Sequence, residues 1–90
     1  MSAKESISPQ LDAFLTALKP YGLDEAVVSN IRALAESVKT EAAMRQPDQG
    51  RIAQQLDRIK ALLATAASAA VPVADFAAAI ESIRSAVGHL

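Results

Sequence analysis

Apolar residues recur every three or four positions along most of this 90-residue chain, and breaks containing proline or glycine divide the pattern into four runs. This spacing gathers apolar side chains on one face of an α-helix. The alternation of apolar and polar residues that is typical of strands does not occur. The sequence therefore predicts an all-α fold, namely a four-helix, mainly antiparallel bundle with a long central helical hairpin. The expected helices cover residues 9–19, 24–45, 49–70 and 73–87.

Capping and helix-breaking residues set the ends of these helices. Ser8 and Pro9 suit an N-cap and a first helical position. Asp24 and Asp48 suit the N-caps of the second and third helices. Pro72 separates the third helix from the fourth, because the residue before a proline is disfavoured in helical geometry.

The two central helices carry apolar seams with a spacing of four and three residues, which is typical of close helix–helix contacts. In the second helix the expected seam is Val27, Ile31, Leu34 and Val38. In the third helix it is Ile52, Leu56, Ile59, Leu63, Ala66 and Ala70. We therefore expect these positions to face the core of the bundle.

The segment between Lys60 and Asp75 is alanine-rich and carries no charge. A membrane-spanning helix needs about 20 consecutive apolar residues, whereas this segment is shorter and is interrupted by Pro72. Two amphipathic helices with closely approaching backbones explain it better. Binding to a membrane surface stays open as a lesser alternative.

The composition limits the classes of partner and compartment. Nine basic and ten acidic residues give a net charge of −1, which argues against general nucleic-acid binding. The chain has no cysteine, and its polar beginning lacks the apolar core of a signal peptide, so we expect a cytoplasmic protein. The alanine bias suggests a bacterial source. Residues 1–7 are expected to be a flexible N-terminus and residues 8–90 a single helical domain.

The sequence shows no catalytic pattern. Its one histidine, His89, is the penultimate residue, whereas a general base must be held within hydrogen-bond reach of its target. The three glycines are isolated, so no phosphate-binding loop is present. We therefore expect no enzymatic activity, no cofactor, no metal and no small-molecule substrate.

The expected helix lengths predict a partner-binding surface. The shorter first and fourth helices would cover the same half of the central hairpin and leave its tip bare. An exposed apolar seam of this kind is typical of an interaction site. The predicted partner-binding residues are Val38, Ala42, Met44, Arg45, Arg51, Ile52, Gln55 and Leu56. On this view Ile52→Asp abolishes association and leaves the helices intact.

A family resemblance covers residues 46–88, about half of the chain. The stretch QPDQGRIAQQLDRIKALLATAASAA followed by FAAAIESIRSAVG resembles the small helical modules of bacterial conflict (anti-phage) proteins. In these modules a turn containing Pro and Asp leads into an Arg-Ile helix, an alanine-rich segment and a last short helix. The resemblance implies an adaptor or assembly domain that joins an effector to a sensor or to further copies of itself.

Together these patterns favour a protein–protein interaction module whose partner is another copy of the chain. One alternative is a small regulator, of the antitoxin, immunity or chaperone type, that masks a specific partner protein. A membrane-surface binder and a nucleic-acid accessory protein are lesser alternatives. Nucleic-acid binding would fall steeply with salt concentration.

Overall fold

The computed structural model describes residues 3–66 and 71–90, and within them the chain forms four α-helices, one short 3-10 turn and no strand. The elements are α1 (Ala3–Leu18), η1 (Lys19–Tyr21), α2 (Glu25–Ala42), α3 (Gln49–Ala66) and α4 (Val73–Val87). The predicted all-α, four-helix fold is confirmed.

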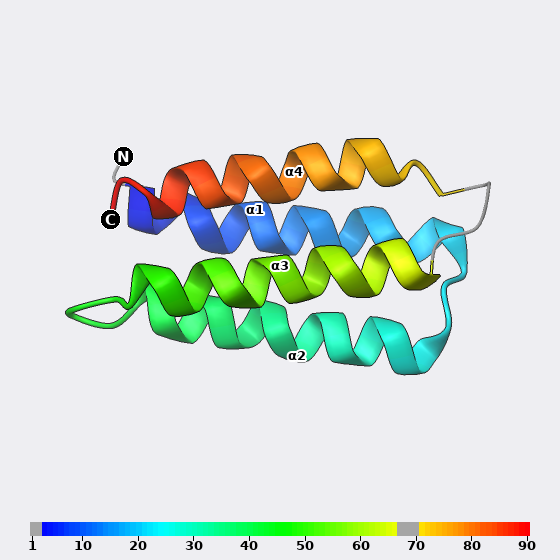
Figure 1. The fold of residues 1–90 in the computed structure, drawn as a ribbon, viewed down its shortest axis with the longest axis horizontal. Helices are drawn as coiled ribbons and strands as arrows, with labels where there is room; N and C mark the ends of the chain where they lie inside the picture. Colours follow the sequence, from blue (N-terminus) through cyan, green and yellow to red (C-terminus); the bar gives the residue numbers. More distant parts are fainter. Residues whose placement is uncertain (1–2, 67–70) are drawn as a thin grey trace.

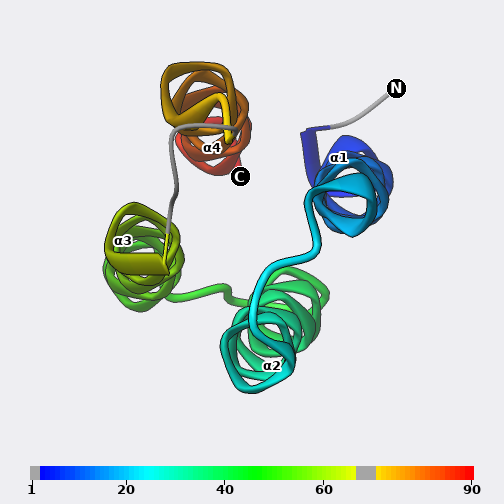
Figure 2. The ribbon, with the colours of Figure 1, turned by 90° about the vertical axis from the view of Figure 1, so that its right-hand side faces the viewer.

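The helices run up and down in turn, and each lies beside the next along the chain (Figure 1). Seen from one end, they stand at the corners of a ring in the order α1, α2, α3 and α4, which brings α4 back against α1 (Figure 2). The molecule measures 39 × 21 × 18 Å. The start of α1, the C-terminus and the α2–α3 connection lie at one end, and η1 lies at the other (Figure 1).

The core is a single cluster to which every helix contributes one apolar stripe. Its members on α1 and α2 are Ile7, Leu11, Phe14, Leu18, Ile31, Ala35, Val38 and Ala42. Its members on α3, on α4 and just before α4 are Ile52, Leu56, Ile59, Leu63, Val71, Phe76, Ile80, Ile83 and Val87. No polar or charged residue is buried among the residues described.

The three aromatic rings meet near the η1 end of the core. Phe76 on α4 contacts Phe14 on α1 and Tyr21 in η1, each edge to face with ring centroids 5.6 Å apart. This is the geometry that aromatic pairs prefer. The rings thereby fix the end of α1 against the start of α4.

The first helix begins earlier than expected. Residues 3–7, predicted to be flexible, form the first turns of α1, and Pro9 lies inside the helix. A proline there removes one backbone hydrogen bond and costs about 3 kcal/mol. Ile7 offsets much of that cost because it is fully buried, and complete burial of such a side chain is worth about 1.5–3 kcal/mol. The Ser8–Pro9 start was therefore wrong because Ile7 extends the apolar stripe by one turn.

The other helix boundaries lie close to the predictions. Asp24 accepts a hydrogen bond from the backbone N–H of Ala26 (2.9 Å), and Asp48 accepts one from Arg51 (3.1 Å), so both predicted caps are confirmed. The second helix ends at Ala42 rather than at residue 45. The expected end of the third helix, including Ala70, lies outside the described residues.

The turn between α1 and α2 depends on Gly22. Its φ of 60° lies in the left-handed region, which residues with a Cβ atom rarely adopt. The Gly22 N–H donates to the carbonyl of Lys19 across a long 3.5 Å. This turn sets where α2 begins beside the end of α1.

Candidate interaction surfaces

The predicted uncovered tip of the hairpin does not exist in this fold. Val38, Ala42, Ile52 and Leu56 are each at most 3% exposed and belong to the core. The expectation was wrong because the first helix starts at residue 3 and therefore reaches the tip. Ile7 lies beside Ala42 there, where both line the same small cavity. These four residues cannot contact a partner while the bundle is folded.

The other four predicted residues lie at or near the α2–α3 connection. Met44 is 47% exposed, and Arg45 and Arg51 are exposed. Gln55 is only partly exposed, and its side-chain amide donates to the Ser37 hydroxyl (2.7 Å), so it links α3 to α2. Of the eight predicted partner-binding residues, only Met44, Arg45 and Arg51 are thus exposed at this end of the bundle.

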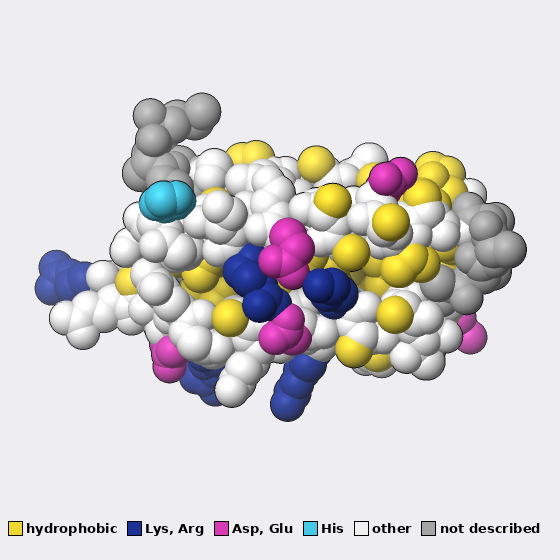
Figure 3. All heavy atoms as spheres, turned by 45° about the horizontal axis from the view of Figure 1, so that its top comes forward, with side chains coloured by type: hydrophobic (Ala, Val, Ile, Leu, Met, Phe, Trp, Pro, Cys, Tyr) yellow, Lys and Arg dark blue, Asp and Glu magenta, His cyan; other side chains and the backbone are white. Residues whose placement is uncertain are grey.

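Ion pairs cross the outer edge between α3 and α4. Lys60 on α3 pairs with Glu81 on α4 (3.0 Å), and Arg84 on α4 pairs with Asp57 on α3. Charged side chains gather in the middle of this face, with hydrophobic side chains on either side (Figure 3). We call this edge of the bundle the α3–α4 seam. All four of these charged side chains are paired within the molecule.

The α1–α2 seam is likewise crossed by charge. Lys39 on α2 pairs with Asp12 on α1 and also contacts Glu36 one turn earlier (3.3 Å). The hydrogen bond to Asp12, helped by Glu36 and opposed by partial burial, raises the pKa of Lys39 above its usual 10.5. This ion pair therefore links α1 to α2 at Asp12 and Lys39.

The two remaining seams are crossed by neutral hydrogen bonds in the described structure. Between α1 and α4, the Ser82 hydroxyl donates to the Gln10 side-chain oxygen across a long 3.4 Å. Between α2 and α3, the link is that of Gln55 and Ser37. The bundle thus has ionic and neutral seams in alternation around the ring.

A shallow apolar cavity of about 550 Å³ follows the outside of the α2–α3 seam. We call it the α2–α3 outer groove, and its lining residues are Asn30, Ala33, Leu34, Arg58, Ala61, Leu62 and Thr65. Arg58 is the one charged residue among them.

Leu34 was expected in the core seam, but it is only half-buried, and the neighbouring Ala35 is fully buried instead. Leu34 therefore packs at the margin of the core, because α2 turns its small Ala35 toward the centre. Leu62 is likewise half-buried beside the fully buried Leu63. The hint in the sequence was that Leu62 and Leu63 together make the apolar stripe wider than one seam needs.

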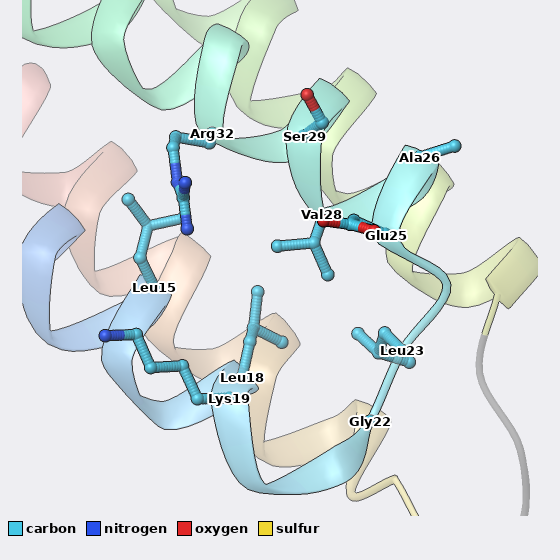
Figure 4. Close-up of a pocket in the computed structure, with 10 residues that line it drawn as sticks. All are labelled: Leu15, Leu18, Lys19, Gly22, Leu23, Glu25, Ala26, Val28, Ser29 and Arg32. Carbon is cyan, nitrogen blue, oxygen red and sulfur yellow. The ribbon is translucent and has the colours of Figure 1, made fainter.

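A second cavity, of about 620 Å³, opens between the end of α1 and the start of α2 (Figure 4). We call it the α1–α2 pocket. Leu15, Leu18 and Val28 form its apolar wall together with Leu23, and polar side chains surround them. The full lining is Leu15, Leu18, Lys19, Gly22, Leu23, Glu25, Ala26, Val28, Ser29 and Arg32. No signal in the sequence pattern placed these residues together.

Two further properties concern the described residues only. They contain no group of three or more His, Cys, Asp or Glu side chains placed to hold a metal ion. None of the helices combines the length and the hydropathy needed to cross a lipid bilayer.

Comparisons with known proteins give no relative. No protein-family model, no curated protein and no solved structure matches the chain at a significant level.

Proposed function

We propose that this chain is a non-enzymatic protein–protein interaction module that self-associates through the α2–α3 outer groove. The observation that carries the proposal is the pair of half-buried leucines, Leu34 and Leu62, on an edge of the bundle whose only lining charge is Arg58. The monomer leaves these side chains partly in water. A second copy with the same groove would cover them.

The remaining burial supports a weak, reversible dimer. Complete burial of a leucine is worth about 1.5–3 kcal/mol, and each of the four leucines in a dimer has at most about a third of its surface left to bury, so they contribute at most roughly 2–4 kcal/mol. Association also carries costs in lost translation and rotation. We therefore expect only weak association, with a dissociation constant of about 1 mM.

A two-fold arrangement suits the charges of the groove. In a symmetric pair each surface contacts its own equivalent. Antiparallel packing then carries Arg58 of each copy away from its equivalent and toward the Asn30–Thr65 end of the other groove, where neutral hydrogen-bonding side chains lie. Alanines Ala33 and Ala61 let the helices approach closely.

The test is the molecular mass in solution, measured by light scattering behind size exclusion from about 10 μM to about 1 mM. The wild-type mass should rise from 9.4 kDa toward twice that value with concentration. Ala61→Lys should hold the mass at that of the monomer, because it brings added positive charge next to Arg58 in both copies.

A matched control is Ala13→Lys. Ala13 is also an exposed alanine beside a neutral seam, but it lines the α1–α4 edge. This variant should associate like the wild type. A wild type that stays at 9.4 kDa throughout would overturn the proposal, as would association that Ala13→Lys abolishes and Ala61→Lys leaves unchanged.

The wider role we propose is that of a bacterial, cytoplasmic adaptor or assembly domain, in line with the resemblance of residues 46–88 to modules of conflict proteins. A weak self-contact is useful in such a domain because several copies held on one assembly raise each other's effective concentration. Association that appears only at high concentration would therefore still serve assembly.

A further inference from the structure

We propose that the α1–α2 pocket binds a short amphipathic helix of a different protein, with acidic side chains at one end of its apolar face. The proposal does not depend on self-association, because the pocket and the α2–α3 outer groove share no residue. It concerns a second surface that would give the module a partner of another kind.

The charges at the pocket call for an anion. Lys19 from α1 and Arg32 from α2 both line it, and both extend to the side where Leu15 lies (Figure 4). Neither forms an ion pair within residues 3–66 and 71–90. Farther along the same seam, by contrast, Lys39 meets Asp12. At the pocket, two positive charges therefore lie on either side of the α1–α2 seam. Farther along this seam, opposite charges form an ion pair across it.

The wall of the pocket suits an apolar side chain. Leu18 and Val28 point into the opening from opposite helices, and Leu15 and Leu23 close its two sides (Figure 4). Leu15, Leu23 and Val28 are only half-buried in the monomer. A helix laid between α1 and α2 would cover all three, as in the helix-in-groove mode of recognition.

The one acidic residue in the lining sets the direction of the partner helix. Glu25 begins α2 and therefore stands about 10 Å along the helix axis from Arg32. An acidic side chain of the partner would be repelled near Glu25 and attracted near Arg32 and Lys19. The partner's acidic end therefore lies over the two cations.

A second copy of this chain is a poor occupant. Its only exposed large hydrophobic residues are Tyr21 and Met44 among those described, and neither lies within an α-helix. Its best apolar edge, the α2–α3 outer groove, carries Arg58, which Lys19 and Arg32 would repel. The apolar face and the acids must come from another protein.

The experiment uses the full chain and a labelled synthetic peptide of about 14 residues, long enough to form a helix on binding. The peptide carries leucines at helical spacings i, i+4 and i+7 and two glutamates at one end of that face. Fluorescence anisotropy of the labelled peptide, titrated with protein up to about 1 mM, gives the dissociation constant. A second peptide replaces the glutamates with lysines, and we expect it to bind about tenfold more weakly.

Variants locate the binding site. Lys19→Gln with Arg32→Gln should weaken binding of the glutamate peptide about tenfold and remove most of the difference between the two peptides. The matched control is Arg45→Gln with Arg51→Gln, which removes two exposed arginines far from the pocket and should leave the affinity unchanged. Thermal unfolding of each variant checks that it folds.

Three results would overturn the proposal. The first is no binding of the glutamate peptide up to about 1 mM protein, which corresponds to less than about 4 kcal/mol. The second is equal loss of affinity in both double variants, which would mean that only net charge matters. The third is binding of a fatty-acid anion, dodecanoate, at the pocket while the peptide does not bind, which would make it a site for a small amphiphile.

Discussion

The α2–α3 and α3–α4 seams share helix α3, yet their outer edges differ. The α3–α4 seam carries two crossing ion pairs, Lys60–Glu81 and Arg84–Asp57. The α2–α3 seam carries two half-buried leucines and one lining charge. Exposed ion pairs add little stability, but they resist burial because burial removes charges from water. The pairs therefore keep the α3–α4 edge in water and leave the α2–α3 edge free to meet another protein.

The largest expected effect comes from the inner side of the α2–α3 seam. Ile52→Asp places a charge at a fully buried position and should lower the free energy of unfolding by more than about 4 kcal/mol. The whole bundle is expected to have roughly 5–13 kcal/mol. Far-UV circular dichroism should show loss of helix or a much lower unfolding temperature. The sequence analysis expected Ile52→Asp to abolish association and to leave the helices intact, whereas the burial of Ile52 predicts unfolding. A variant that keeps its helices but no longer associates would contradict this prediction.

Two adjacent leucines of α3 lie on the two sides of this seam: Leu63 is in the core, and Leu62 lines the α2–α3 outer groove. Leu63→Ala should lower the free energy of unfolding by about 3–5 kcal/mol, because Leu63 is only 1% exposed. Leu62→Ala should cost only about 1–2 kcal/mol in the monomer, since Leu62 is half-buried. Urea unfolding in dilute solution measures both. Equal losses would mean that Leu62 is part of the core and that the groove is no free surface.

Without its charges, the outer edge of the α3–α4 seam should become apolar like that of the α2–α3 seam and should then be able to contact another copy. Changing Asp57, Lys60, Glu81 and Arg84 all to alanine removes two acids and two bases, so the net charge stays at −1. Each pair contributes only about 0.2–1 kcal/mol to stability, so the bundle should still fold. Light scattering should then show stronger association than in the wild type. Unchanged association would mean that the ion pairs do not limit contact at this edge.

The smallest expected effect concerns Lys39 on the α1–α2 seam. Its pKa is raised in the folded protein by Asp12 first and then by Glu36, so its stabilising contribution is complete below about pH 10 and is lost as the pH rises through the raised value. Because Asp12 and Glu36 are 61% exposed, the contribution is about 0.2–1 kcal/mol. Urea unfolding at about pH 9 and pH 12 should show a larger loss in wild type than in Lys39→Gln. Equal losses of unfolding free energy in the wild type and in Lys39→Gln would mean that the charge of Lys39 does not contribute to stability.

The sequence predicted the helices well because local signals determine them. The fourth helix occupies residues 73–87 as expected, and Asp24 and Asp48 cap α2 and α3. The start of α1 was missed because Ser8 and Pro9 form a strong local signal, whereas the burial of Ile7 depends on where α2 ends. Burial by a distant helix cannot be read from a local pattern.

The interaction surfaces could be predicted only in part. Ile31 and Val38 are buried as predicted, and Ala35 rather than Leu34 fills the core between them, a choice that depends on packing against α3. The α1–α2 pocket depends on the turn at Gly22, which sets how closely Lys19 and Arg32 approach. Residue spacing along one helix allows both Leu34 and Ala35 in the core and does not decide between them, and it does not place two helices relative to each other.

The most direct test of the central claim is a dilution series of isotope-labelled protein, from about 1 mM to about 10 μM, followed by the amide signals in nuclear magnetic resonance. The account predicts concentration-dependent shifts at residues of the α2–α3 outer groove, such as Ala33, Ala61 and Leu62, and constant positions for Glu81 and Arg84 on α4. Shifts confined to the α3–α4 seam or to the loop around Met44, or no shifts at all, would contradict it.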